Sequence, residues 1–111
     1  MQVALTTEAA ALDVFRQTEH VVPVRVLVDR ILMEPRDIEG LFPECVVLAH
    51  VTRDEHRQLG PLWRDHPELY EAMLSAPPQE LVEIGLRRYT KRSLTLRSRA
   101  RADAVAGRRH D

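Results

Sequence analysis

The chain of 111 residues is 44% hydrophobic and 30% charged, with a formal net charge of −1 at pH 7. This length and composition are those of one globular domain and exclude a largely disordered chain. The single cysteine excludes an internal disulfide, which favours a reducing compartment such as the cytoplasm, or a phage particle. The longest apolar runs, such as residues 45–49, are too short to span a bilayer, and no secretory signal peptide is recognisable, so we expect no membrane partner.

Residues 7–19 are predicted to form the first helix. Thr6 or Thr7 can cap its N-terminus, and the run of alanines that follows has a high helix propensity. The chain has only five aromatic residues. Because each ring would contribute a large buried area, we expect Phe15 and Trp63 to matter to the packing of the core.

Residues 23–33 are predicted to form the second helix. Apolar side chains recur there at the i, i+3, i+4, i+7 and i+8 spacing of an amphipathic helix, and Pro23 suits a first helical position. Arg25 and Asp29 are spaced as an i, i+4 pair on the outer side of this helix. The valines of residues 21–28 leave a strand as the alternative.

Two further segments are less ambiguous. Residues 34–43 are predicted to be a connector, since Pro and Gly punctuate it, with Leu41 and Phe42 turned inward. Residues 61–75 are predicted to contain a short helix in which Pro67 occupies the first helical position.

The segment between them, residues 44–59, allows two structures. Residues 45–51 have the apolar character of a buried strand, and Thr52 with Glu55 would then form a capping box that opens a polar helix. A single helix from Pro43 to Leu59, stopped by Gly60, is the other possibility. The pattern of apolar residues does not choose between the two.

Residues 78–106 are predicted to form one long helix. Apolar or small residues recur at spacings of four and three, which gives a narrow seam of the kind seen in coiled coils. Gly107 can stop this helix. A strand over residues 93–98 is the alternative. The members of the seam are Val82, Leu86, Tyr89, Ser93, Leu96 and Ala100.

Charge is divided unequally along the chain. Residues 1–84 carry 7 arginines and 15 acidic residues, a balance of −8, whereas residues 85–111 carry 9 basic and 2 acidic residues, a balance of +7. We therefore expect an acidic globular body over residues 1–84. Residues 85–111 would be a basic C-terminal helix or tail, either part of the same single domain or an extension of it.

The basic segment is the main candidate for partner binding. Phosphate backbones reward clustered cations because each neutralised phosphate releases counterions, so nucleic acid is one predicted partner. An acidic protein surface, including that of another copy, is the second, and we expect a homo-oligomer or part of a complex. The residues predicted to make these contacts are Arg87, Arg88, Lys91, Arg92, Arg97, Arg99 and Arg101.

No set of residues has the spacing of a known catalytic or metal site. Weak candidates for metal ligands are Cys45, His50, His56 and His66, whose spacings match no zinc pattern. Cys45 lies in an apolar run beside Glu44, which disfavours a reactive thiolate. We therefore expect no cofactor and no catalytic residue.

The sequence as a whole predicts a mainly α fold of about five helices that ends in a long basic C-terminal helix. The alternative is an α+β fold with short strands near 21–28, 45–51 and 93–98. Its 15 arginines, single lysine and lack of asparagine indicate a GC-rich bacterium or its phage. The function expected is that of a small non-enzymatic regulatory protein that binds nucleic acid through the basic helix. The alternatives are a structural or assembly protein whose basic tail docks on an acidic neighbouring subunit, and a small metal-binding enzyme or enzyme subunit.

Overall fold

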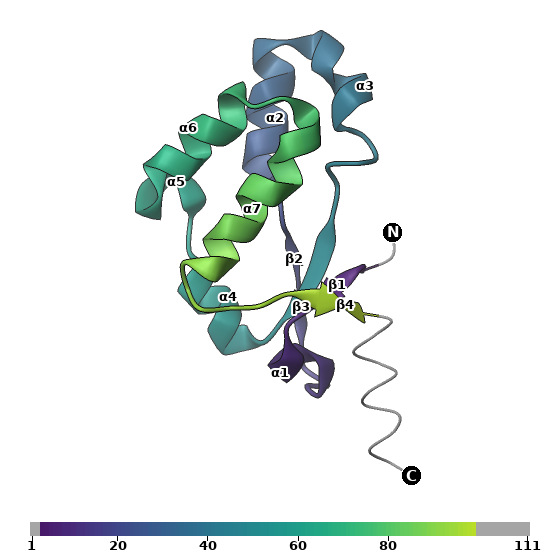
Figure 1. Cartoon of the computed structure of the whole chain (residues 1–111), viewed down its shortest axis with the longest axis vertical. Helices are drawn as coiled ribbons and strands as arrows, with labels where there is room; N and C mark the ends of the chain where they lie inside the picture. Colours follow the sequence, from purple (N-terminus) through teal and green to yellow (C-terminus); the bar gives the residue numbers. More distant parts are fainter. Residues whose placement is uncertain (1–2, 100–111) are drawn as a thin grey trace.

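The computed structural model describes residues 3–99 and has an α+β fold. Four short strands form a mixed sheet; α4 and α7 pack against it, and Figure 1 shows α2 and α3 beyond one end of the strands and α1 beyond the other. The expectation of a mainly α fold is therefore wrong, and the α+β alternative is right in kind. The reason is that the strands are two to four residues long and depend on pairing partners far away in the sequence.

The sheet has the strand order β2-β3-β1-β4. Strand β1 runs parallel to β3, whereas β2 is antiparallel to β3 and β4 is antiparallel to β1. The register aligns Thr18, His50, Thr6 and Arg97 in one row across the four strands. The strands are β1 (Leu5–Thr6), β2 (Gln17–His20), β3 (Leu48–Val51) and β4 (Arg97–Ser98).

The helices are short, and none in the described part exceeds 10 residues. The α-helices are α1 (Glu8–Ala11), α2 (Val24–Met33), α3 (Ile38–Leu41), α4 (Arg53–Leu59), α5 (Leu62–Asp65), α6 (Pro67–Ser75) and α7 (Leu81–Thr90). The 3₁₀ helices η1 (Pro35–Asp37) and η2 (Pro78–Glu80) lead into α3 and α7.

The core consists of two clusters that meet at α7. The larger cluster lies among the helices and includes Val26 of α2, Leu41 of α3, Met73 of α6 and Leu81 of α7, all fully buried. The smaller cluster joins the sheet to α4 and α7. Its members are Val21, Ala49, Val51, Leu59 and Tyr89, each no more than 1% exposed. Helix α7 therefore contributes to both clusters and connects the helices to the sheet.

The first predicted helix, residues 7–19, is wrong in its length. Thr7 does cap α1, since its hydroxyl accepts a hydrogen bond from the Ala10 N–H at 3.1 Å, but the helix ends at Ala11. Asp13 then forms a turn by accepting a hydrogen bond from the Phe15 N–H at 2.8 Å. The next residues pair with β3 as β2. The core roles predicted for Phe15 and Trp63 are also wrong, because these rings are 83% and 46% exposed.

The predicted second helix is confirmed, and the strand alternative over residues 21–28 is wrong. Helix α2 spans Val24–Met33, with Pro23 at its N-cap, and Arg25 and Asp29 are paired at 3.2 Å on its outer side. In the connector that follows, Leu41 is buried as expected, but Phe42 is 43% exposed, so its predicted inward position is wrong.

The two structures considered for residues 44–59 are decided in favour of strand and helix. Strand β3 is followed by Thr52, whose hydroxyl accepts from the Glu55 N–H while the Glu55 carboxylate accepts from the Thr52 N–H. This capping box starts α4, and Gly60, with a φ of 56°, ends it. The single helix from Pro43 to Leu59 is therefore wrong. Downstream, Pro67 occupies the first position of α6, as predicted.

The long helix predicted over residues 78–106 is also wrong in the described part. Helix α7 ends at Thr90, and the chain reverses through Ser93, which has a left-handed φ of 58°. The Ser93 N–H donates to the Thr90 carbonyl, and the Leu94 N–H donates to the Tyr89 carbonyl. This is a Schellman motif with serine in the place usually held by glycine. The chain then continues into β4, within the alternative strand over residues 93–98. The remainder of the predicted helix lies outside the described residues.

Gly85 is required where α7 approaches the end of β2. A Cβ atom at this position would lie 2.5 Å from the carbonyl oxygen of Val21, which is backbone and has little room to move. We therefore expect Gly85→Ala to lower the free energy of unfolding by about 1–3 kcal/mol.

Urea-induced unfolding would measure the effect of Gly85→Ala, with Gly40→Ala as the matched control. A Cβ on Gly40 would meet only the side chain of Pro78 at 3.4 Å, within ordinary contact. Because alanine favours helix over glycine, Gly40→Ala should leave stability unchanged or raise it. Equal losses in the two variants would contradict the steric argument.

Candidate partner-binding surface

The basic residues predicted to bind a partner do not form a detached tail. Arg88 is only 4% exposed, and its Nη2 lies 3.5 Å from Glu19 Oε2 and 3.4 Å from the His20 carbonyl oxygen. Its guanidinium also lies over the ring of Tyr89, 5.4 Å from the centroid. Arg88 therefore attaches the last turn of α7 to β2 inside the molecule.

Two other cations of this segment are paired at the surface. Lys91 Nζ lies 3.3 Å from Glu68, and Arg97 Nη2 lies 3.7 Å from Glu8. All four side chains are at least 43% exposed, so water and salt screen these pairs and each contributes little to stability. Such pairs can open when a partner supplies a better anion.

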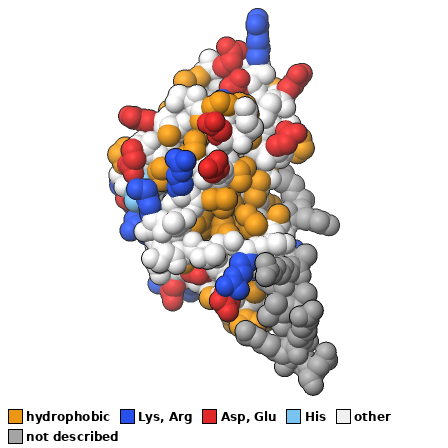
Figure 2. Space-filling model, viewed as in Figure 1, with side chains coloured by type: hydrophobic (Ala, Val, Ile, Leu, Met, Phe, Trp, Pro, Cys, Tyr) orange, Lys and Arg blue, Asp and Glu red, His pale blue; other side chains and the backbone are white. Residues whose placement is uncertain are grey.

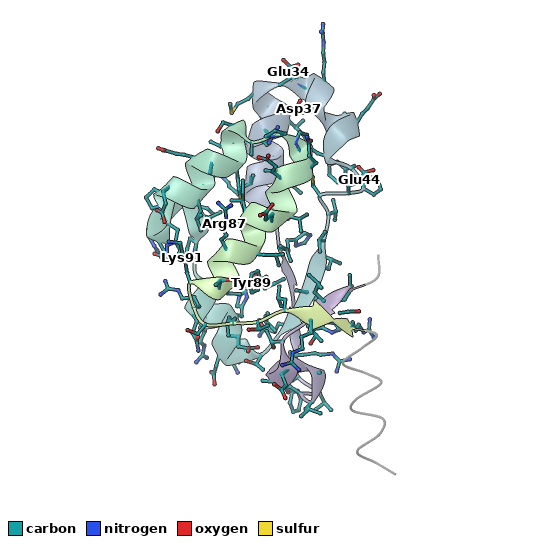
Figure 3. The ribbon with its side chains drawn as sticks, in the orientation of Figure 1. Glu34, Asp37, Glu44, Arg87, Tyr89 and Lys91 are labelled. Carbon is teal, nitrogen blue, oxygen red and sulfur yellow. The ribbon has the colours of Figure 1, made fainter. Side chains whose placement is uncertain are left out.

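The remaining predicted contacts divide into three groups. Arg87 and Arg92 are exposed, and neither makes an ion pair with any residue in the described part of the chain. Figure 3 shows Arg87 and Lys91 on the same side of α7, as their i, i+4 spacing requires. Arg99 is half-buried, and its backbone N–H donates to the Ala4 carbonyl at 2.8 Å. Arg101 lies outside the described residues.

A hollow lined by both apolar and hydroxyl side chains lies beside this basic segment. It has a volume of about 460 Å³ and is formed where α7 faces the segment that returns toward β4. Figure 2 shows hydrophobic side chains gathered in the middle of that face, directly above the returning segment. We call it the C-terminal hollow. Its lining residues are Leu86, Tyr89, Thr90, Ser93, Leu94, Thr95 and Leu96.

The opposite end of the molecule is both acidic and apolar. Residues 32–44, here called the acidic end, contain four acidic residues and one arginine. Figure 3 labels Glu34 and Asp37 near the top of the view, and Glu44 lower, on the side across from Arg87 and Lys91. Four large hydrophobic side chains are exposed among them. They are Leu32 (75%), Met33 (66%), Ile38 (48%) and Phe42 (43%).

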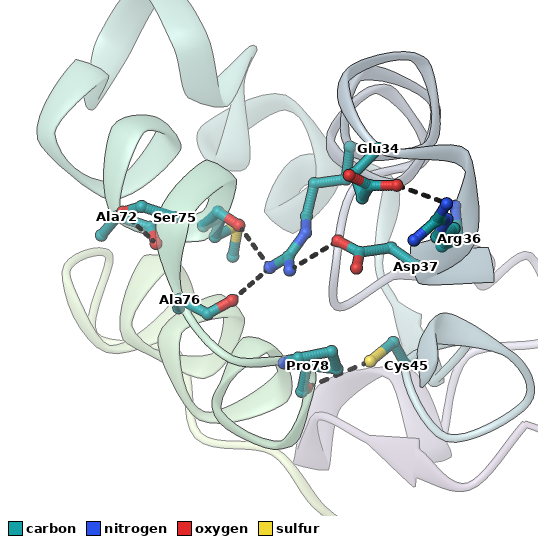
Figure 4. A network of polar contacts seen from close by, with 10 residues as sticks. Glu34, Arg36, Asp37, Cys45, Ala72, Ser75, Ala76 and Pro78 are labelled. Atoms are coloured by element: carbon teal, nitrogen blue, oxygen red, sulfur yellow. Dashed lines mark hydrogen bonds and ion pairs between the residues drawn. The ribbon is translucent and has the colours of Figure 1, made fainter. Parts of the chain in front are cut away.

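A buried arginine fixes the position of the acidic end. Arg30 Nη1 donates to the Met73 carbonyl at 3.1 Å and to the Ala76 carbonyl, while Nη2 lies 3.1 Å from Asp37 Oδ2 (Figure 4). Nearby, the Cys45 thiol donates to the Pro78 carbonyl at 3.2 Å. The contacts of Arg30 join α2 to η1 and to the end of α6, and so hold the start of the acidic end against the other helices.

The residues considered as metal ligands are not brought together. Cys45 is buried, and its burial raises the pKa of the thiol, which keeps it protonated and unreactive. His56 Nδ1 pairs with Glu19 Oε1 at 2.5 Å, His66 lies 3.7 Å from Glu68, and His50 is in β3. Within residues 3–99 no three side chains of the ligand types come close enough to hold a metal ion.

Sequence reasoning missed the acidic end. Val24, Val28 and Leu32 belong to the amphipathic pattern that predicts the helix over residues 23–33, but they are 50%, 46% and 75% exposed. The sequence does contain a sign of this exposure: hydrophobic residues occur on nearly every side of α2, so its apolar surface is unusually wide. A helix that is apolar over so wide an arc needs a neighbour on more than one side.

Comparisons with protein families, with curated proteins and with solved structures give no match to this chain. Its function is therefore inferred from its own geometry. None of the helices in residues 3–99 has the length and apolar character needed to cross a bilayer.

Tyr89, at the C-terminal hollow, gives a pH-dependent prediction. Burial raises its pKa to about 12, above the ordinary value of 10, although Arg88 works in the opposite direction. The unfolded chain therefore releases this proton at lower pH than the folded one. The shifted pKa of Tyr89 therefore contributes to the free energy of unfolding. This contribution is fully present below pH 10 and is lost as pH rises to about 12, and its upper bound is about 2–3 kcal/mol.

Tyr89→Phe should remove this part of the decrease in stability at alkaline pH. Urea unfolding at neutral and alkaline pH would measure the free energy of unfolding of both proteins. At neutral pH the variant should be at least as stable as the parent chain, because the buried hydroxyl has no hydrogen-bond partner among the described residues. Parallel pH profiles for the two proteins would contradict the assignment.

Proposed function

We propose that the protein is a small non-enzymatic assembly protein, of the cytoplasm or a phage particle, that acts by associating with further copies of itself. The observation that carries the proposal is the amount of large hydrophobic side chain left on its surface. Three of its five aromatic rings are more than 40% exposed. The exposed residues are Leu12, Val14, Phe15, Val24, Val28, Leu32, Met33, Ile38, Phe42 and Trp63. Apolar surface gathered in patches is typical of protein interfaces.

Charge supports a second copy as the partner. Residues 86–97 carry five cations and no acidic residue, whereas the acidic end carries an excess of three negative charges. Figure 2 shows most of the acidic side chains on that face in its upper half, over α2, α3 and the start of α7. A single chain thus presents two surfaces of opposite charge, and each surface includes apolar side chains that association would bury.

Sedimentation velocity across a wide range of protein concentrations tests the proposal. The weight-average mass should rise above the 12.8 kDa of the single chain as concentration increases. High salt should lower the mass at a given concentration, because the attraction between the opposite charges is screened. A single species of 12.8 kDa at every concentration would contradict self-association.

A second candidate function is nucleic-acid binding through the basic segment. It is favoured by Arg87 and Arg92, which are exposed and have no ion pair in the described part of the chain, and by the weakly held cation of Lys91. The basic segment contains no exposed aromatic ring, so contacts to phosphate rather than stacking on bases would dominate.

Fluorescence anisotropy with labelled DNA and RNA tests this candidate. We expect binding at low salt whose affinity falls steeply as salt rises, and Arg87→Ala/Arg92→Ala should reduce both affinity and salt slope. The matched control is Arg53→Ala/Arg57→Ala, which removes two exposed cations from α4. Equal losses in both double variants, or no binding at low salt, would exclude a specific role for the basic segment.

A further inference from the structure

We propose that copies of the protein associate head to tail, with the acidic end of one copy seated in the C-terminal hollow of the next. The inference rests on the proposed self-association and specifies its geometry. The occupant of the hollow is thus the helical end formed by the last turn of α2, η1 and α3 of another copy. Shape, polarity and charge of the two surfaces support this pairing.

The acidic end has the shape of a projecting knob. It comprises the turn between α2 and α3, and Figure 1 shows it at one extremity of the molecule. Leu32, at the end of α2, is 75% exposed, and Ile38, at the start of α3, is 48% exposed. The contact of the buried Arg30 with the partly exposed Asp37 holds η1 against α2, which lowers the conformational entropy that binding of the knob would cost.

The C-terminal hollow has the size and lining to receive such a knob. Its volume of about 460 Å³ exceeds what a single leucine or isoleucine side chain fills, so it can accept a small cluster of apolar groups. Leu86, Leu94 and Leu96 are half-buried there, which leaves apolar surface for a partner to cover. The Schellman turn at Ser93 fixes the rim of the hollow.

The charges near the two surfaces would attract each other. Glu34, Glu39 and Glu44 surround the apolar residues of the knob, while Arg87 and Arg92 lie on the helix and turn that form the hollow. Two exposed charges oppose the pairing: Arg36 in the knob and Glu83, one turn before Leu86 on α7. Reversing the charge of Glu83 therefore tests whether the hollow attracts a negatively charged partner.

The knob and the hollow are different surfaces, so their pairing is heterologous. A bound pair still has one free knob and one free hollow. Association therefore continues with concentration and produces closed rings or open chains rather than stopping at a dimer. An isologous pairing, in which the same surface meets itself around a twofold axis, would stop at the dimer.

Complementation between two variants tests the geometry. Leu32→Glu/Ile38→Glu removes the apolar surface of the knob, and Thr95→Glu places a negative charge in the hollow. All three positions are exposed, so the variants should fold, which circular dichroism and urea unfolding would check. Each variant alone should sediment as a monomer. An equimolar mixture should form a 1:1 heterodimer and nothing larger, because one intact knob and one intact hollow remain.

Two further variants sharpen the test. Glu83→Lys removes the opposing charge beside the hollow and should increase association at least several-fold, whereas weaker association would contradict the charge argument. Phe15→Ser is the matched control, since it removes an exposed aromatic ring from a turn that belongs to neither surface. It should leave the mass distribution unchanged.

Each remaining outcome separates this inference from the proposed function. Association that survives Thr95→Glu but is lost in the knob variant would indicate pairing of like ends, and the head-to-tail arrangement would be rejected while self-association stands. Association that survives both variants would place the interface elsewhere. A parent chain that is monomeric at every concentration would reject both proposals.

Discussion

The arrangement of the helices depends on the burial of one guanidinium group, that of Arg30. Removing a charged side chain from water is costly unless hydrogen bonds replace the hydration. Here two carbonyl groups at the end of α6 and the carboxylate of Asp37 supply them. The planar fork of arginine can join its own helix to two other elements at once, which a lysine ammonium on a flexible stem does less well. This single group therefore sets the position of α6, α2 and η1, and with them the surface formed by residues 32–44.

Arg88 has a corresponding role at the sheet. Its contacts with Glu19 and His20 mean that the most basic part of the sequence begins inside the fold rather than beyond it. Residue 85, where the balance of charge changes along the chain, lies in the middle of α7. Acidic side chains of residues 1–84 thus meet the basic segment within one compact unit, and the unpaired positive charge is left on the end of α7 and the turn after it.

Local signals predicted the elements that local interactions form. The sequence showed the apolar period of α2, the capping box at Thr52 and the cap at Thr7, because each depends on residues within one or two turns. The sheet was predicted only in part, as alternative strands over residues 45–51 and 93–98 that contain β3 and β4. Strands of two to four residues have no measurable period, and β1 pairs with residues more than 40 positions away. The stop after α7 was missed because Ser93 adopts the left-handed conformation that usually indicates glycine. The same reversal forms the C-terminal hollow, so the sequence could not predict that surface. It did predict that Leu86 and Tyr89 share one apolar face of the helix.

The place of β1 in the sheet also has a consequence for synthesis on the ribosome. This strand is central, with β3 on one side and β4 on the other. It is translated before β3, whereas β4 is translated only after all the helices of the described part. Until then one edge of β1 offers unpaired backbone groups to any extended segment nearby. A nascent chain stalled after α7 would be open to strand pairing with a neighbour on the same message.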